Sequence, residues 1–176
     1  MEHDMLIRIT NKTNEKIKLG KLTNIEIDGK PKFFEEWYIN TLVLNRKTYL
    51  ILTEGVSLFS IIKYAKGINT KAKFESFIFE TIKELFNDLA PGIKLEDIPI
   101  GNIEYSKAIN GSILKNQSDQ IYHAKRYAKE GINTFEINRI PLKAIEFQFP
   151  VEVFIAEMGK ILLSKGYTWT PDSLRN

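Results

Sequence analysis

Residues 37–66 constrain the fold more than any other part of the sequence. They contain three apolar runs separated by two short polar segments, Asn45-Arg46-Lys47 and Thr53-Glu54-Gly55. Runs of this length that are rich in Ile, Val, Leu, Thr and aromatic residues favour strands over helix. Connections this short force neighbouring strands to be antiparallel, because a parallel crossover needs about a dozen residues. We therefore predict an antiparallel meander at the centre of a sheet, with strands at residues 38–44, 48–52 and 56–64.

Residues 1–36 are predicted to contribute further strands. Residues 5–10 alternate well enough for a first strand, and residues 17–22 for a weak edge strand. A third run, residues 25–27, leads into an Asp28-Gly29 turn. This region is hairpin-like, and whether it lies on the edge of the sheet is left open by the sequence.

Apolar periodicity predicts three helices after the meander. The clearest spans residues 74–89, where apolar residues recur at intervals of three and four, with Asn69-Thr70 as the N-cap. The second helix is expected at residues 110–130, and the third runs from Pro150 to residue 166. Short strands are expected at residues 103–106, 135–137 and 144–149, and a loosely ordered tail at residues 167–176.

These elements predict an α+β fold in which about three helices pack on an antiparallel sheet. At 176 residues the chain is long enough for one domain with a proper core and short for two. We therefore expect a single domain over residues 1–176. It divides into N-terminal strands at 1–36, the central meander at 37–66, helices with interspersed strands at 70–166, and the tail.

The composition excludes several classes of function. The chain has no cysteine and two histidines, so thiolate chemistry is ruled out and neither a metal nor another cofactor is predicted. No apolar run approaches the roughly 20 residues needed to span a bilayer, and the first residues carry no basic segment typical of a secretory signal. A cytoplasmic protein without membrane contact is therefore expected. The net charge of +3 is mild for a dedicated nucleic-acid binder.

A basic and aromatic cluster on the second helix is the first candidate site. It consists of Lys115, Tyr122, His123, Arg126 and Lys129, on or beside the face opposite the apolar one. Basic side chains can neutralise phosphates, and a tyrosine can stack on an unpaired base. The alternative is a solvated helix face, because cations near a helix C-terminus are favoured by the helix dipole.

Two further candidates lie at turns. Asn110, Gly111 and Ser112 open the second helix, where free backbone N–H groups can hold an anion, although simple helix caps have the same composition. The central turn and its flanks could line a pocket, or could serve as a core anchor and a solubilising turn. The residues of this third candidate are Trp37, Asn40, Asn45, Arg46 and Lys47.

Signals of catalysis are weak. The sequence contains no G-x-S-x-G elbow, no H-E-x-x-H pair and no cysteine nucleophile. His123 could serve as a general base in a metal-independent nuclease, with Asp119 and Arg126 within reach on the helix surface. That spacing often arises by chance, so no catalytic residue is assigned.

The central stretch resembles a bacterial family of small domains of unknown function with a W-x-A-N-L-L … D-R-R-K … L-F-T … L-F-S pattern. The resemblance extends from Met5 to about Leu163, but Ile39 and Asn45 depart from the pattern, where the family has Ala and Asp. Members of this family are sometimes fused to plasmid-type replication-associated domains, which implies a mobile-element context and no particular activity. The matching residues are Met5–Thr10, Trp37-Tyr38, Asn40, Thr41-Leu42, Asn45-Arg46-Lys47, Leu52-Thr53, Leu58-Phe59-Ser60 and, loosely, Ala108–Asp119.

Three functions follow as hypotheses. The leading one is a non-enzymatic protein-interaction module of a phage, plasmid or toxin–antitoxin locus, whose partner is another protein. The second is an RNA- or nucleotide-binding domain that uses the basic helix face and the Arg46-Lys47 turn. The third is a small metal-independent nuclease or hydrolase centred on His123. Self-association into a homo-oligomer is left open.

Overall fold

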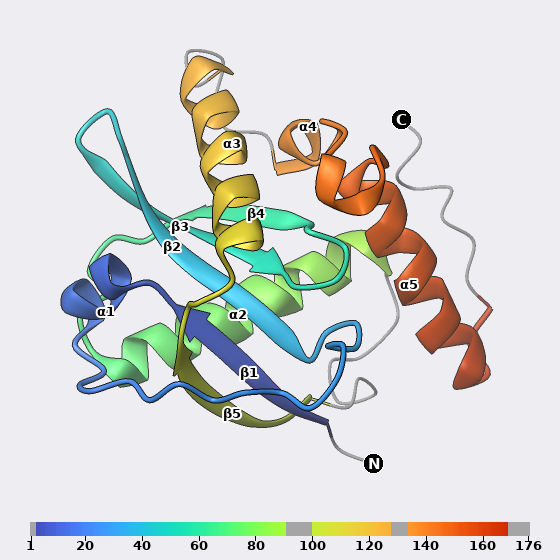
Figure 1. The fold of residues 1–176 in the computed structure, drawn as a ribbon, viewed down its shortest axis with the longest axis horizontal. Coiled ribbons are helices and arrows are strands. Elements are labelled where there is room, and N and C mark those ends of the chain that lie inside the picture. Colours follow the sequence, from blue (N-terminus) through green and yellow to red (C-terminus); the bar gives the residue numbers. More distant parts are fainter. Residues whose placement is uncertain (1–2, 91–99, 128–133, 169–176) are drawn as a thin grey trace.

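The computed structural model of the chain describes residues 3–90, 100–127 and 134–168. Five strands form one sheet in the order β4-β3-β2-β1-β5 (Figure 1). Helices pack on both faces, so the α+β class is confirmed. The strands are β1 (His3–Ile9), β2 (Glu36–Leu44), β3 (Lys47–Glu54), β4 (Ser60–Tyr64) and β5 (Ile100–Lys107).

The predicted meander is present, but the sheet is mixed, so the expectation of an antiparallel sheet was only partly right. β2, β3 and β4 pair antiparallel, in register from Trp37 opposite Glu54 to Leu44 opposite Lys47. β1 pairs parallel with both β2 and β5. The connection from β1 to β2 occupies residues 10–35, well beyond the dozen or so residues that a parallel crossover requires.

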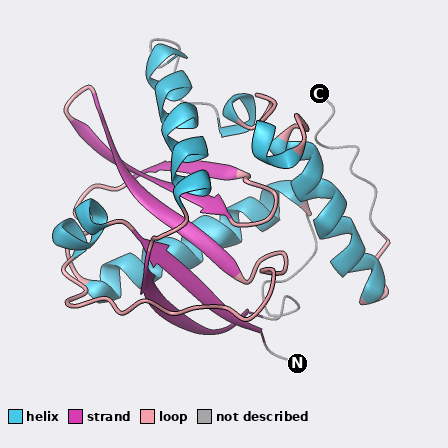
Figure 2. Cartoon of the chain, in the orientation of Figure 1, coloured by secondary structure: helices cyan, strands magenta, loops and turns pink. Residues whose placement is uncertain are grey.

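β1 lies inside the sheet, and the predicted N-terminal hairpin-like region is wrong. Residues 17–22 and 25–27 form no strand. Instead, Thr10 caps helix α1 (Asn11–Ile17), accepting a hydrogen bond at its hydroxyl from the Thr13 N–H at 3.4 Å. Residues 18–35 then run as loop and turn along the sheet (Figure 2). The apolar alternation in this segment comes from side chains that pack on the domain without joining its ladder.

One face of the sheet carries the larger hydrophobic core. Helices α2 (Lys71–Leu89) and α5 (Pro150–Ser164) cover this face, and α2 crosses behind the strands in Figure 1. Both were predicted, including the Thr70 cap of α2 and the proline that opens α5. Aromatic rings fill the space between the helices and the sheet, with Phe59 and Phe154 at 4.5 Å between centroids. Trp37 is fully buried in this core.

The opposite face is covered by α3 (Gly111–Tyr127) and the short α4 (Thr134–Ile137). The predicted helix at 110–130 matches α3, although its last residues lie outside the described part. A continuous row of buried side chains crosses all five strands on this face. From one edge to the other, the row is Ser106, Arg8, Tyr38, Thr53 and Ser60.

A directed chain of hydrogen bonds fixes α3 on this polar row. The Ser60 hydroxyl donates to Gln120 Oε1 at 2.6 Å, so Thr53 donates to Ser60, also at 2.6 Å. The Thr53 oxygen is then free to accept from Gln117 Nε2 at 2.9 Å, and the same Nε2 donates to the Tyr38 carbonyl. Buried polar groups are costly unless they are paired, so this chain specifies how α3 sits on the sheet.

Two strands predicted near the C-terminus are absent. Residues 135–137 belong to α4, and residues 144–149 contain a 3-10 turn, η2 (Lys143–Ile145), with one isolated bridge from Leu142 to Gln148. Glu146 and Phe147 both have left-handed backbone angles, at φ 56° and 62°. Two such residues in succession reverse the chain, so the alternation of Ile145, Phe147 and Phe149 does not build a strand. With α1 and α4, the described residues contain more helices than the three predicted.

The third strand of the meander starts later than predicted, because a buried carboxylate organises residues 55–59 as a loop. Glu54 is fully buried and accepts hydrogen bonds from the Phe34, Val56 and Ser57 amides and from the Ser57 hydroxyl. Phe34, one of these donors, and Leu58 in the loop both have left-handed conformations, which bulky residues rarely adopt. Burial raises the pKa of Glu54 above its ordinary value, and the hydrogen bonds offset part of that rise.

The raised pKa of Glu54 makes stability depend on pH. Because the folded state binds this proton more tightly than the unfolded state, the contribution of Glu54 is fully present below its unfolded pKa. It declines as pH rises through the folded pKa. We expect the difference in unfolding free energy between the wild type and Glu54→Gln to fall as pH rises from the unfolded pKa to the folded pKa of Glu54. Above the folded pKa the difference should level off. Urea denaturation at a series of pH values measures it, and a constant difference would contradict the assignment.

Candidate functional site

A pocket of about 290 Å³ lies at the end of the sheet where the β2–β3 hairpin turns. Three segments far apart in the sequence meet there: α1, the hairpin turn, and the linker between β4 and α2. α1, the hairpin tip and the start of α2 all lie on the left side of Figure 1. The pocket is lined by Lys16, Arg46, Lys47, Thr48, Tyr64, Ala65, Lys66, Gly67, Ile68 and Asn69.

The hairpin turn is tight and places two cations at the pocket. Leu44 pairs with Lys47, so Asn45 and Arg46 are the two turn residues, both left-handed at φ 48° and 60°. This geometry is typical of a type I′ turn, whose second position usually carries glycine. Placing an arginine there costs about 1–2 kcal/mol relative to glycine. A strained backbone at a surface pocket suggests that the side chain has a role beyond closing the turn.

Four cationic side chains line the pocket: Lys16, Arg46, Lys47 and Lys66. The described lining residues include no carboxylate and no histidine. Within the described ranges, no salt bridge joins any of these four cations to an acidic side chain. Four positive charges exceed the net charge of the whole chain, +3, so the rest of the chain carries a slight acidic excess. The pocket is therefore a local cluster of positive charge on a chain whose remaining charges nearly balance.

Two tyrosines on neighbouring strands flank the cations. Tyr64, at the end of β4, is 45% exposed, and its ring centroid lies 5.4 Å from that of Tyr49, its partner on β3. The Lys47 ammonium lies 5.8 Å above the Tyr64 ring. On the opposite face of the sheet from Tyr49, Lys16 Nζ donates a hydrogen bond to the Thr48 hydroxyl at 2.6 Å. This bond attaches α1 to the hairpin. The pocket thus combines fixed aromatic surface with several exposed cations.

The structure separates the residues of the third predicted site. Arg46 and Lys47 line the pocket, and Asn45 forms the adjacent turn position. Trp37 lies in the hydrophobic core, with its ring 5.1 Å from that of Phe34. Asn40 is half-buried, and its Oδ1 accepts hydrogen bonds from the Thr10 hydroxyl and the Thr41 amide.

The predicted cluster on the second helix is partly described. Lys115, Tyr122 and Arg126 are exposed on α3, and Lys129 lies outside the described residues. Ile121 and Ala124 of α3 pack in the cluster of Leu42, Ile51, Ile62 and Ile137, and Tyr49 packs in it too. The C-terminal half of α3 therefore lies over the hairpin end of the sheet, on the face that carries Tyr64. None of the α3 residues lines the pocket itself.

His123, on the same helix, is half-buried, with its ring at 5.6 Å and nearly perpendicular to that of Tyr122. Asp119 and Arg126 are exposed about one turn before and after it. These positions follow from helical spacing alone, as the sequence indicated. His123 is not among the residues that line the basic pocket.

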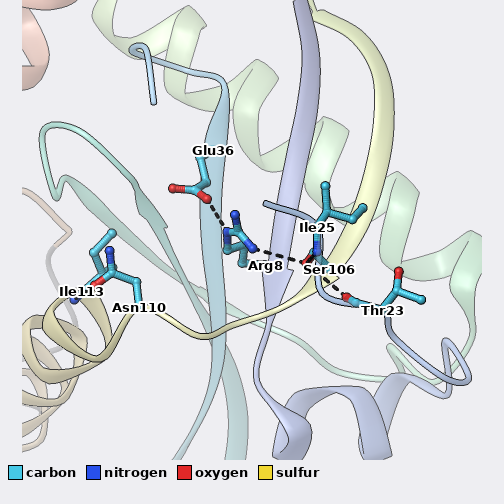
Figure 3. A network of polar contacts seen from close by, with 7 residues as sticks. All are labelled: Arg8, Thr23, Ile25, Glu36, Ser106, Asn110 and Ile113. Atoms are coloured by element: carbon cyan, nitrogen blue, oxygen red, sulfur yellow. Dashed lines mark hydrogen bonds and ion pairs between the residues drawn. The ribbon is translucent and has the colours of Figure 1, made fainter. Parts of the chain in front are cut away.

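The predicted anion site at the start of α3 is occupied by its own cap. The Asn110 Oδ1 accepts hydrogen bonds from the Ser112 and Ile113 amides at 3.1 and 3.3 Å (Figure 3). An anion at this position would have to compete with the Asn110 side chain for the same donors. Gly111 and Ser112 are exposed, so solvent reaches this helix end.

A buried ion pair that the sequence did not reveal lies beside this cap. Arg8 on β1 donates from Nε to the Glu36 carboxylate on β2, and both residues are only 4% exposed. Arg8 also donates to the Ser106 hydroxyl at 3.3 Å (Figure 3). The Ser106 hydroxyl donates to the Thr23 carbonyl and accepts from the Ile25 amide, at 3.1 and 2.9 Å. This network joins three strands and the loop along β5, which indicates a structural role.

Tyr38 extends the network toward α3. Its pKa is raised, first by burial and then by the nearby Glu36 carboxylate, so the phenol stays protonated and can donate to that carboxylate. Tyr38 lies opposite Arg8 in the register of β1 and β2. The Glu36 carboxylate therefore has the Arg8 guanidinium and the Tyr38 phenol as hydrogen-bonding neighbours.

Other chemistry is limited in the described part of the chain. Residues 3–90, 100–127 and 134–168 contain no group of three or more His, Cys, Asp or Glu side chains placed to hold a metal ion. None of the described helices combines the length and apolar character that crossing a membrane requires. The basic pocket is thus the described feature with the most evident binding chemistry.

Lys16, Tyr64 and Lys66 were missed by the sequence analysis. The last two could have been found, because an antiparallel meander returns the end of β4 to the start of β3, next to Lys47. Lys16 could not, because the segment that contains it was predicted as loop and weak strand. Its position depends on α1 and on the parallel pairing of β1.

Comparison with known proteins identifies the family. The family model described as "Domain of unknown function (DUF6933)" matches residues 6–153. The chain belongs to the DUF6933 family. No curated protein and no solved structure matches the chain significantly.

The DUF6933 match includes every described residue that lines the basic pocket, as well as the Arg8 network and the whole of α3. It ends inside α5, so most of this helix lies beyond the matched region. The pocket is therefore built from the part of the chain that defines the family. The family assignment agrees with the resemblance noted in the sequence, and it carries no activity with it.

The Arg8–Glu36 pair makes a stability prediction. Arg8→Met leaves the Glu36 carboxylate buried without its cation, which should lower the unfolding free energy by about 3–5 kcal/mol. The double variant Arg8→Met/Glu36→Met removes both charges and should lose less than the single Arg8 variant. Urea denaturation of the wild type, both single variants and the double variant measures this coupling. Additive losses would show that the two side chains act independently.

Proposed function

We propose that this DUF6933 domain is a non-enzymatic binding module whose ligand carries phosphate groups and binds at the basic pocket. One observation carries the proposal: Lys16, Arg46, Lys47 and Lys66 converge on the pocket, and no described lining residue is acidic. Like charges at close range repel and lower stability, so an unpaired cluster is costly to keep. A negatively charged ligand removes that cost on binding.

The chemistry of the lining favours phosphate over a simple carboxylate. Arg46 offers a planar guanidinium fork suited to two phosphate oxygens, and the lysines act as mobile point charges around it. A volume of about 290 Å³ lies near the lower limit of small-ligand sites, so the pocket suits one phosphorylated unit at a time. A larger ligand would have to extend outside it.

The position of the pocket in the fold agrees with a binding role. β1, β2, β4 and β5 point in one direction and only β3 runs against them. The pocket lies beyond the carboxyl ends of β2 and β4, beside the helix that follows β1. Open sheets with parallel strands generally bind ligands beyond the carboxyl ends of their strands.

The absence of a general base among the described lining residues supports binding over catalysis. Thr48, Tyr64 and Asn69 are the polar uncharged groups of the lining, which includes no histidine or carboxylate, the side chains that commonly serve as general bases. His123, the candidate base, comes from α3 and is not one of the lining residues. A protein partner, the leading expectation from the sequence, would meet the same pocket if it carried phosphorylated side chains.

Removing two pocket cations tests this proposal. Arg46→Gly removes a charge while relieving the left-handed strain, and Lys66→Ala removes a second. With labelled inorganic polyphosphate, we expect wild-type affinity to fall steeply with salt. The double variant should show a slope of log K against log [salt] that is shallower by about 1.4 to 1.8. Fluorescence anisotropy at a series of salt concentrations measures both slopes.

The matched control is Lys83→Ala/Lys143→Ala, which removes the same total charge at two exposed positions outside the pocket. This control should retain the wild-type slope and most of the affinity. Equal losses in the two double variants would mean that polyphosphate binds through overall charge. That result would reject the pocket as the site.

A further inference from the structure

We infer that the ligand of the basic pocket is single-stranded nucleic acid, with an unpaired base stacked on Tyr64. This inference rests on the proposed function and adds the class of ligand. The pocket holds two kinds of contact together: cations that suit the phosphate backbone, and a half-exposed aromatic ring that suits a base. A ligand made only of phosphates would contact the cations but would not contact the Tyr64 ring.

Tyr64 is fixed in place and yet accessible. It ends β4 in register with Tyr49, and the two rings contact each other at 5.4 Å between centroids, which restricts the Tyr64 side chain. Its 45% exposed fraction leaves a large part of the ring open to solvent. A pre-ordered aromatic surface loses little conformational freedom on binding, so stacking on it is efficient.

Lys47 occupies the position that a base would take. Its ammonium lies 5.8 Å above the Tyr64 ring, in an exposed cation–π contact. Such contacts are weaker than the stacking of a base on an aromatic side chain, so an arriving base displaces Lys47. The released ammonium can then meet the phosphate next to that base. Displacing Lys47 therefore allows both the stacking of the base on Tyr64 and the contact of the Lys47 ammonium with a phosphate.

The geometry favours a strand over a duplex or a free nucleotide. A duplex hides its base faces within its own stack, so Tyr64 could not use them. A single nucleotide offers too few charges to occupy cations brought in by α1, the hairpin and the linker after β4. Further cations, Lys125 and Arg126, are exposed near the end of α3, which lies over the same end of the sheet. A strand that leaves the pocket has these cations within its reach.

The test compares a short labelled oligothymidylate with an abasic strand of the same length and charge. We expect wild type to bind the oligothymidylate more tightly than the abasic strand. Tyr64→Ala should weaken oligothymidylate binding by roughly five- to hundredfold, the usual range for loss of one stacked base. It should leave abasic-strand binding unchanged, while Tyr64→Phe keeps the ring and should bind like wild type.

Phe79→Ala is the matched control, since Phe79 on α2 is an aromatic of similar exposure, 42%, outside the pocket. It should bind both strands as wild type does. Thermal unfolding of each variant, followed by circular dichroism, checks that the fold is retained; Tyr64→Leu, which keeps apolar bulk, replaces Tyr64→Ala if the latter fails to fold. Loss of affinity in Tyr64→Leu with retention in Tyr64→Phe supports the stacked base.

Three outcomes would overturn the inference. If wild type binds the abasic strand as tightly as the oligothymidylate, no base is stacked, and the phosphate-binding function stands without it. If a multiply phosphorylated peptide binds through Arg46 and Lys66 while neither strand binds, the ligand is a protein. If neither strand, the peptide nor polyphosphate binds, the proposed function itself fails.

Discussion

β1 lies inside the sheet between β2 and β5, parallel to both, and the rest of the architecture depends on that position. A strand enclosed on both edges and both faces must satisfy every polar group it carries. Arg8 is the difficult residue of β1, because its charged side chain is buried away from solvent. The Glu36 carboxylate and the Ser106 hydroxyl satisfy it from the two neighbouring strands. The same contacts that neutralise Arg8 therefore fix the order of β2, β1 and β5.

Parallel pairing also determines where the chain segments emerge. Because β1 and β2 run in the same direction, the chain leaves β1 toward the hairpin end, and α1 forms there. β4 runs antiparallel to β3, so it too ends at the hairpin, and its linker brings Lys66 alongside the turn. Three cationic segments thus meet because of strand direction. The location of the pocket follows from the topology. Its positive charge comes from the lysine and arginine residues that these three segments carry.

The sequence predicted the meander, α2, α3 and α5 because in each of them local periodicity and burial agree. It failed where a tertiary contact overrides the local pattern. Ile25 alternates like a strand residue, yet its amide bonds to the Ser106 side chain. Phe147 follows the same alternation but has a left-handed backbone. Of the residues that line the pocket, the sequence analysis named Arg46 and Lys47 as part of the central turn and its flanks, whereas Lys16 depended on an unforeseen helix. The local pattern could not predict the pairing of strands far apart in the sequence, or the positions of the segments that this pairing brings together.

The hairpin turn contains an arginine, Arg46, at a position where another residue would make the fold more stable. Asn45 and Arg46 both adopt left-handed angles, and glycine at the second position would fit that turn with less strain. A neutral residue there would also reduce repulsion among the neighbouring lysines. Both effects act against Arg46, and neither the core nor the sheet gains from its side chain, which is exposed. Stability alone does not account for an arginine at this position. The negatively charged ligand proposed for the pocket would give that side chain a role.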